Sequence, residues 1–183
     1  AIEDKMGIKG SSTRELIFKD CKVPKENLLL EEGKGFKIAM QTLDGGRIGV
    51  AAQALGIAEG ALERTIKYVK ERQQFGRPIA NFQNTQFKLA EMAIEIEAVR
   101  NLVYYAATQK DNGENYTVAA ATAKYKAAKV AMDVTTEAVQ LHGGYGYSAE
   151  YEVERMMRDA KITQIYEGTS EVMLMVVSGS LLR

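Results

Sequence analysis

Three long segments with helical periodicity and no internal proline constrain the fold of this chain more than any other feature. Both prolines, Pro24 and Pro78, lie outside these segments. The spacing of apolar residues predicts long helices over about 36–72 and 83–110, and a third whose apolar face extends over 118–139. Helices of this length bury an apolar stripe against one another, so we expect a mainly α-helical domain.

Two shorter helices complete the expected set. Ser148 is expected to cap a helix that ends near Ala160, and Thr169 to cap a last helix that reaches Leu182. The breaks between the long helices are short, which favours antiparallel neighbours and therefore an antiparallel helical bundle. No self-similar period of about 20–50 residues occurs, which disfavours a helical solenoid.

The faces of the long helices predict how they pack. Glycine and alanine recur along 36–72, at a cost in helix propensity that close approach of other helices would offset. In 83–110 the main apolar stripe is expected at Phe87, Ala90, Ile94, Ala98, Leu102 and Tyr105. The following helix is expected to present Val118, Thr122, Tyr125, Ala128, Met132, Thr135 and Val139 on one face. Apolar residues off the first stripe, such as Ile96 and Val103, indicate that 83–110 buries more than one face.

The first 33 residues differ from the rest of the chain. Short apolar runs at 16–18 and 28–30, separated by a turn signal, predict two or three short strands. Because a hairpin-sized unit is marginal in water, we expect 1–33 to be the end of a β-domain and 34–183 to be the helical domain. The chain does not begin with Met, and we expect it to be part of a longer protein.

Composition narrows the function. The chain has 24 basic and 24 acidic residues, and this balance argues against a nucleic-acid-binding protein. No apolar run approaches the length that crosses a bilayer, so we expect no membrane partner. With one cysteine, Cys21, and one histidine, His142, we expect neither a zinc site nor a Cys-His catalytic pair.

The segment 166–171, YEGTSE, places a carboxylate directly before a glycine and a helix start. Gly168 permits a turn that other residues avoid, and Thr169 is a good helix N-cap. Glu167 would then lie on the rim of a cleft, where a carboxylate shielded from water can act as a general base. On spacing alone, a favourable contact with the helix dipole is the more common role of such a residue.

Seven motifs occur along the chain in a fixed order. They are MGIKGSST at 6–13, DCKVPKENLL at 20–29, GFKIAM at 35–40, RQQFG at 72–76, QLHGGYG at 140–146, RDA at 158–160 and IYEGTSE at 165–171. Any one of them is weak evidence, but their order and spacing together are highly specific. Over its whole length the chain resembles the C-terminal part of an acyl-CoA dehydrogenase, and within that family the short-chain type.

The resemblance implies a reaction and a base. In the family, two hydrogens leave the α and β carbons of a fatty acyl-CoA: a glutamate takes the α proton, and the β hydrogen leaves as hydride to a flavin. The matching glutamate is Glu167. Some relatives carry the base on the first long helix, but no carboxylate stands at the matching position around Gly46, which favours Glu167 and a straight, short-chain substrate. The substrate-side residues implied are Asp44, Gly45, Gly46, Arg47, Tyr166 and Gly168.

An alternative stays open for two of these residues. The spacing of Asp44 and Arg47 also fits a plain helix ion pair, worth about 0.2–0.5 kcal/mol. The resemblance favours substrate contact.

The resemblance also implies FAD as cofactor. Residues implied to reach the FAD of a neighbouring subunit are Arg72, Gln74, Phe75, Gln83, Gln140, Leu141, His142, Gly143 and Gly144. Thr169 and Glu171 would contact the chain's own FAD. A shared cofactor site implies a homo-oligomer, usually a dimer of dimers. Without the resemblance, Gly143 and Gly144 are simply a helix C-cap.

The resemblance further implies that electrons pass to an electron-transferring flavoprotein, in the bacterial cytoplasm or the mitochondrial matrix. Two alternatives stay open. An acyl-CoA oxidase of the same fold would pass electrons to oxygen, and a helical interaction domain would have kept the fold without catalysis.

Overall fold

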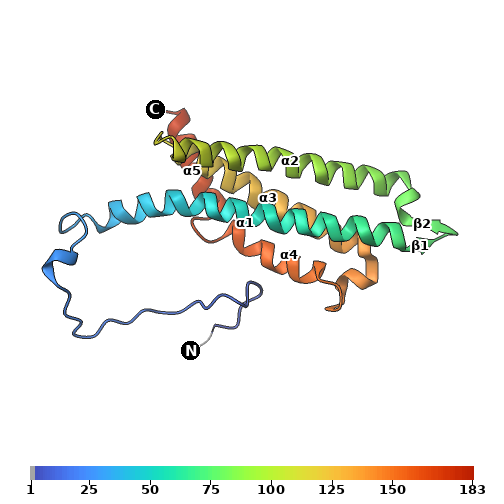
Figure 1. Cartoon of the computed structure of the whole chain (residues 1–183), viewed down its shortest axis with the longest axis horizontal. Coiled ribbons are helices and arrows are strands. Elements are labelled where there is room, and N and C mark those ends of the chain that lie inside the picture. Colours follow the sequence, from blue (N-terminus) through green and yellow to red (C-terminus); the bar gives the residue numbers. More distant parts are fainter. Residues whose placement is uncertain (1–2) are drawn as a thin grey trace.

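The computed structural model describes residues 3–183 and contains five α-helices within that range (Figure 1). The helices are α1 (Gly35–Glu71), α2 (Gln83–Asp111), α3 (Thr117–His142), α4 (Val153–Lys161) and α5 (Ser170–Leu181). The bounds of α1, α2 and α5 agree with the predicted ranges to within one or two residues. Ala1 and Ile2, the first residues of the expected N-terminal segment, lie outside the described residues.

A short antiparallel hairpin joins α1 to α2. Its strands are β1 (Gln73–Gln74) and β2 (Arg77–Pro78), and the turn between them contains Phe75 and Gly76 at positive φ. The described residues also contain four 3₁₀ turns, at Lys25–Asn27, Ile79–Asn81, Gly143–Tyr147 and Ile162–Gln164.

The long helices reverse direction from one to the next, which confirms the antiparallel bundle (Figure 1). Helix α3 is central, since it packs against each of the other four helices. The hairpin and the turn after α3 lie at one end of the bundle, and the start of α5 lies at the other (Figure 1). Within residues 3–183, no helix is both long and apolar enough to span a membrane.

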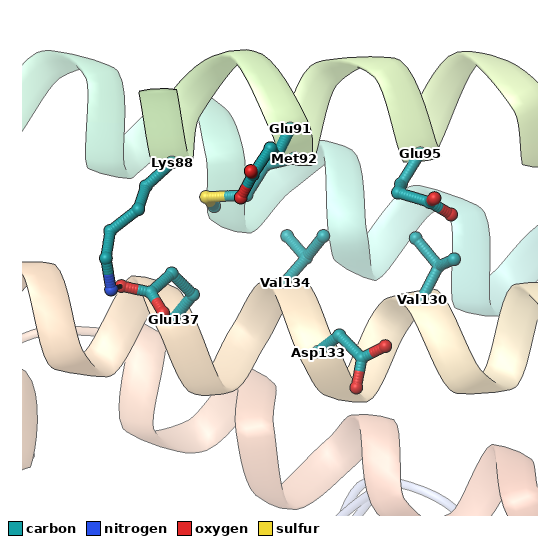
Figure 2. Close-up of a pocket in the computed structure, with 8 residues that line it drawn as sticks. All are labelled: Lys88, Glu91, Met92, Glu95, Val130, Asp133, Val134 and Glu137. Carbon is teal, nitrogen blue, oxygen red and sulfur yellow. Dashed lines mark hydrogen bonds and ion pairs between the residues drawn. The ribbon is translucent and has the colours of Figure 1, made fainter. Parts of the chain in front are cut away.

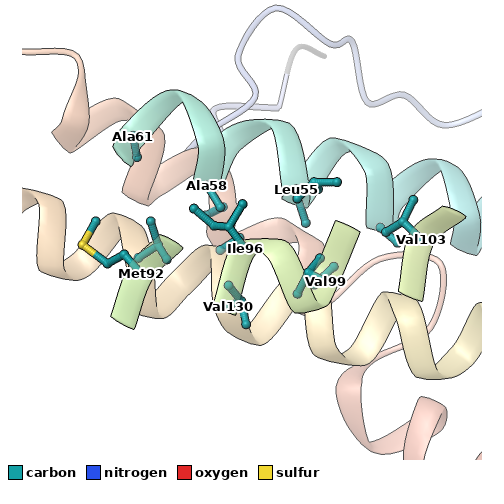
Figure 3. Packing of buried hydrophobic residues seen from close by; sticks show 14 of the residues in the cluster. Leu55, Ala58, Ala61, Met92, Ile96, Val99, Val103 and Val130 are labelled. Atoms are coloured by element: carbon teal, nitrogen blue, oxygen red, sulfur yellow. The ribbon is translucent and has the colours of Figure 1, made fainter. Parts of the chain in front are cut away.

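Small side chains form the contact between α1 and α3. Ala51, Ala54, Ala58 and Ala61 of α1 are all but fully buried. Figure 3 shows Ala58 and Ala61 in this packing. They pack in one core with alanines and valines of α3 and with Met92, Ile96, Val99 and Val103 of α2. This agrees with the close approach predicted for α1. The predicted role does not extend to every glycine, because a Cβ added at Gly49 or Gly56 would meet nothing within 4 Å.

The predicted main stripe of α2 is wrong at most of its positions, although Leu102 is partly buried against the core. Phe87, Ile94 and Tyr105 are 59%, 68% and 58% exposed. The buried face is instead Thr85, Met92, Ile96, Val99, Val103 and Ala106. Both sets recur at helical spacing, so periodicity alone could not choose between them. The contacts with α1 and α3 decide which one is inside.

Two predictions around α3 need correction. The predicted face holds for Ala128 and Thr135, which are buried, but Val118 at the end of the helix is 37% exposed. Because α3 is surrounded by other helices, it buries most of its circumference. Ser148 does not cap α4, since residues after α3 continue as a 3₁₀ turn and α4 begins only at Val153.

The strands predicted near the N-terminus are also absent from residues 3–33. Leu16, Ile17 and Phe18 lie in extended chain and are 78–80% exposed. A strand needs a partner for its backbone N–H and C=O groups, and no other segment of the described chain pairs with this one in a sheet. The segment therefore forms a loop on one side of the bundle (Figure 1).

One part of this N-terminal segment is docked firmly. The backbone N–H of Ile8 donates to Asp159 Oδ1 at 2.6 Å, and Arg158 Nη1 donates to the Met6 carbonyl at 2.6 Å. Gly7 is buried between them, and a Cβ added there would lie 2.6 Å from the Arg158 carbonyl oxygen. The RDA motif of α4 thus holds the residues that precede the helical domain.

The exposure of α2 gives a matched test. We expect Ile96→Ala, at a site 3% exposed, to lower the free energy of unfolding of this chain by about 2–5 kcal/mol. Ile94→Ala, two residues earlier and 68% exposed, should change it by about 0.5 kcal/mol or less. Urea unfolding of the two variants measures the difference. Equal losses would show that the face has been assigned incorrectly.

The docked segment gives a second test. We expect Gly7→Ala to break the contact with α4, because backbone atoms occupy the space that a Cβ needs. Amide exchange at Ile8 should then become at least about tenfold faster, as expected for an opening about 1.4 kcal/mol easier. Gly10→Ala is the control, since a Cβ there meets nothing within 4 Å. Equal exchange in both variants would contradict the docking.

Candidate active site

A left-handed turn carries Glu167 to the N-terminus of α5. Glu167 has φ 57° and Gly168 has φ 99°, so two successive residues lie in the left-handed region. For a glutamate this costs about 1–2 kcal/mol, whereas a glycine adopts it readily. Thr169 caps α5 as predicted, and its hydroxyl oxygen accepts from the Val172 N–H at 3.4 Å.

The Glu167 side chain lies directly over α1. A Cβ added at Gly46 would come within 2.9 Å of the Glu167 carboxyl carbon and closer still to Oε2. Glu167 Oε2 is buried, and none of the described residues donates a hydrogen bond to it. The absence of a side chain at Gly46 is therefore what allows this carboxylate to occupy its position.

Asp44 and Arg47 lie on the same turn of α1. Arg47 Nη1 binds Asp44 Oδ1 at 2.6 Å, and the Thr117 hydroxyl donates to Asp44 Oδ2 at 2.8 Å. Arg47 is buried, and its Nε donates to the Glu167 carbonyl oxygen at 3.4 Å. The ion pair that spacing allowed is thus present, and it also contacts the Glu167 turn.

Lys124 reaches the same turn from α3. Its side chain is fully buried, and Nζ donates to the Gly168 carbonyl oxygen at 2.5 Å. Burial, together with the nearby Arg47 charge, lowers the pKa of Lys124 to about 8, while the Glu167 and Glu171 carboxylates oppose that shift. Four elements therefore meet at Glu167: α1, α3, the turn itself and α5.

The remaining predicted substrate-side residues lie around this turn. The Tyr166 hydroxyl donates to Gln53 Oε1 on α1, and burial raises the pKa of Tyr166. Gly45 lies next to the end of α2, where an added Cβ would meet Lys110 Nζ at 3.4 Å. We call the group formed by Asp44, Gly46, Arg47, Lys124 and Glu167 the Glu167 site.

Sequence reasoning missed Gln53, Thr117 and Lys124. A signal existed for the lysine, because Ala120, Ala121, Ala127 and Ala128 occupy the positions three and four residues on either side of it. A charged residue at the centre of a face made of small apolar residues is either buried with that face or prevents the face from packing against another helix. Gln53 and Thr117 gave no comparable signal.

A second group forms at the other end of the bundle. A cavity of about 510 Å³ is lined by predicted cofactor residues: Arg72, Gln74, Gln140, Leu141, His142, Gly143 and Gly144. Tyr68, Ile79 and Tyr145 complete the lining. We call this group the Arg72 site. The Arg72 guanidinium carbon lies 5.3 Å from the centroid of the Tyr145 ring, a cation–π distance that orients it.

His142 supports the wall of the Arg72 site. Its ring is stacked on Tyr68 with centroids 4.1 Å apart, and Nδ1 lies 2.7 Å from the Ala138 carbonyl oxygen, to which it donates. Burial lowers the pKa of His142, so the ring stays neutral near pH 7. This geometry fits a satisfied local histidine and offers no proton for catalysis.

Four predicted cofactor residues lie outside the Arg72 site. Phe75 is 92% exposed in the hairpin turn, where its ring meets Phe82 edge to face, and Gln83 begins α2. Thr169 and Glu171 lie beside the Glu167 site. Hydrogen bonds from its own backbone N–H and from the Thr169 hydroxyl lower the pKa of Glu171.

The two sites are far apart on one chain. Gly46 and Arg72 are separated along α1 by 26 residues, which corresponds to about 39 Å of helix. The residues predicted for FAD therefore fall into two groups, too far apart to line one compact pocket of the described residues.

A further hollow lies between α2 and α3 and contains none of the predicted site residues. It measures about 280 Å³ and is bordered by Lys88, Glu91 and Glu95 of α2 and by Asp133 and Glu137 of α3 (Figure 2). Three of its carboxylates have lysine partners: Lys88 pairs with Glu137, Lys126 with Glu95 and Lys129 with Asp133. We assign it no role in the chemistry.

The donors of the Arg72 site fit a diphosphate group. A guanidinium fork matches phosphate oxygens, and a Cβ added at Gly143 or Gly144 would meet nothing within 4 Å, so the backbone there is open to a ligand. For a metal the result differs: no group of three or more His, Cys, Asp or Glu side chains suited to a metal ion occurs among the residues described.

Comparison with known proteins identifies the family. Residues 33–182 match the profile of the acyl-CoA dehydrogenase C-terminal domain. The chain is 68% identical over 181 residues to the short-chain specific acyl-CoA dehydrogenase of Megasphaera elsdenii, covering 99% of this chain and 47% of that protein.

Solved structures agree. The butyryl-CoA dehydrogenase of Megasphaera elsdenii matches with a TM-score of 0.98 at 67% identity, over 100% of this chain and 48% of that one. A chain in the structure of the electron transferring flavoprotein of Acidaminococcus fermentans matches with a TM-score of 0.98 at 66% identity, again over 100% and 48%. The chain spans about half the length of the relatives it matches. On the sequence match and the shared fold together, this chain belongs to the acyl-CoA dehydrogenase family.

Proposed function

We propose that this chain is the helical part of an enzyme that uses FAD to dehydrogenate a short-chain acyl-CoA between its α and β carbons. The observation that carries the proposal is Glu167: its Oε2 is buried over Gly46 without a hydrogen-bond donor. A carboxylate oxygen that accepts no hydrogen bond remains available to accept a proton from a C–H group. Such a C–H group forms no strong hydrogen bond of its own. The names of the similar proteins support the substrate class.

The chemistry asked of Glu167 is removal of a proton next to a thioester. Such a C–H is a very weak acid, so the negative charge that develops on the thioester oxygen has to be stabilised as the proton leaves. We propose that the Glu167 backbone N–H donates a hydrogen bond to this oxygen. Excluding water from the site would strengthen this stabilisation of the thioester oxygen, because charges interact more strongly at low dielectric.

FAD, when bound, would supply the acceptor for the β hydride. We propose that Thr169 and Glu171 contact the FAD next to the chain's own Glu167. Arg72, Gln74, Gln140 and the backbone at 141–144 would hold the diphosphate and adenosine portions of another FAD, with Phe75 and Gln83 beside them.

The separation of the two sites supports a shared arrangement. Because the Glu167 site and the Arg72 site lie about 39 Å apart along α1, one chain completes neither FAD site alone. We therefore propose a homo-oligomer in which neighbouring subunits share FAD. We also propose that residues 1–33 belong to a β-domain whose strands would cover the exposed runs at 16–18 and 28–30.

The electron acceptor we propose is an electron-transferring flavoprotein. The match to a chain in the Acidaminococcus fermentans structure supports this choice. An acyl-CoA oxidase is the alternative. Turnover measured with oxygen alone, and then with an electron-transferring flavoprotein, separates the two.

We expect Glu167→Gln in the full-length protein to lower turnover by about 10²–10⁴-fold, the usual contribution of a general base. Glutamine has nearly the shape of glutamate, so FAD absorbance and acyl-CoA binding should stay close to the wild-type values. Steady-state turnover and equilibrium titration with acyl-CoA measure the two effects. Unchanged turnover would refute the assignment of the base.

The contact at Gly46 gives an independent test. We expect Gly46→Ala to push the Glu167 carboxylate out of position and to lower turnover by about tenfold or more, because the added methyl group would overlap it. Gly49→Ala is the matched control on the same helix, since a Cβ there meets nothing within 4 Å. A loss of equal size in both variants would show that the effect comes from the helix and not from the carboxylate.

A further inference from the structure

Two buried cations, from two different helices, hold the carbonyl groups of the Glu167 turn. Arg47 of α1 donates to the Glu167 carbonyl at 3.4 Å, and Lys124 of α3 donates to the Gly168 carbonyl at 2.5 Å. Arg47 is 5% exposed and Lys124 is 0% exposed. The base therefore lies in a turn whose two successive carbonyl oxygens both point into the bundle.

The lysine is the less expected of the two. An apolar side chain of similar length would fill the same space without the cost of burying a charge. Arg47 is already held by Asp44 at 2.6 Å, whereas Lys124 has no ion pair among those found in residues 3–183. Its only hydrogen bond there is to the turn, so its burial is explained by the turn.

The surroundings of Lys124 tie its charge to Glu167. The ionisable groups that act on it are Arg47 from α1, Glu167 from the turn and Glu171 from α5. Arg47 disfavours the lysine cation, and the two carboxylates favour it. The burial of the lysine cation is therefore offset in part by the Glu167 carboxylate.

We infer that Lys124 is a positioning residue for the base: it holds the Gly168 carbonyl so that Glu167 keeps its left-handed backbone with the carboxylate over Gly46. This inference rests on the proposed role of Glu167. A non-glycine residue at φ 57° persists only where its surroundings over-determine it. Without Lys124, one of the two restraints on the turn is lost, and the carboxylate drifts from the position that proton transfer requires.

The test uses Lys124→Met in the full-length protein with FAD. Methionine keeps most of the length of the side chain but removes the donor and the charge. Lys126→Met is the matched control, because Lys126 lies two residues away on α3 and pairs with Glu95 of α2, away from the turn. Circular dichroism and FAD absorbance establish that each variant is folded and loaded.

We expect Lys124→Met to lower kcat by about ten- to a hundredfold while the dissociation constant of acyl-CoA changes little. Lys126→Met should leave both kcat and the dissociation constant at wild-type values. A Lys124→Met enzyme with wild-type kcat would overturn the inference.

A second measurement decides the matter if Lys124→Met does not fold. Burial holds the pKa of Lys124 at about 8 in the folded protein, below its ordinary value of 10.5. Between pH values of about 8 and 10.5, the unfolded chain therefore binds more protons than the folded protein. The urea concentration at the midpoint of unfolding should rise with pH in that range. Removing the Glu167 charge by Glu167→Gln lowers the folded pKa of Lys124 further, and the rise should begin at lower pH. If the urea midpoint depends on pH in the same way in the wild-type protein and in Glu167→Gln, the inference is overturned.

The outcomes separate this inference from the proposed function. If Glu167→Gln keeps full turnover, the base assignment fails. If Glu167→Gln loses turnover while Lys124→Met keeps it, only the role of Lys124 fails.

Discussion

The close contact between α1 and α3 is the constraint on which the rest of this structure depends. Alanines on both helices let their backbones approach, and the same approach brings Gly46 of α1 and Lys124 of α3 to the two sides of the Glu167 turn. Larger side chains at Ala51 or Ala54 would separate the helices, and the cation on α3 would then lose its hold on the turn. The packing of the core therefore fixes the geometry of the site, because protein interiors adjust poorly to added volume.

Several energetically unfavourable features occur together at the candidate base. A glutamate in the left-handed region, a fully buried lysine and a carboxylate oxygen without a donor are each unfavourable by themselves. They occur within one turn and the helices that touch it. Outside it, most buried polar groups are satisfied locally, as His142 is by Ala138 and as Thr65 is by Ala61. Concentrated strain of this kind is typical of a functional site.

The two ends of the bundle carry different groups of candidate residues. One end carries the Glu167 site, and the other carries the Arg72 site, whose guanidinium and open glycine backbone suit phosphate. A helix as long as α1 keeps the two ends at a fixed distance, so a compact ligand cannot contact both sites of one chain. The long helices thus explain why the predicted FAD residues do not form one pocket.

Sequence alone determined the five helices, the Thr169 cap, the left-handed role of Gly168 and the family, because these depend on local spacing and on residue identity in order along the chain. Only the tertiary structure decided which stripe of α2 is buried, since Ile94 and Ile96 belong to stripes of equal periodicity. It also decided that residues 16–18 form no strand, because a strand requires a neighbour. Finally, it alone brought Lys124 and Gly46 to Glu167, since contacts between residues more than 40 positions apart depend on how helices pack and leave no periodic trace in the sequence.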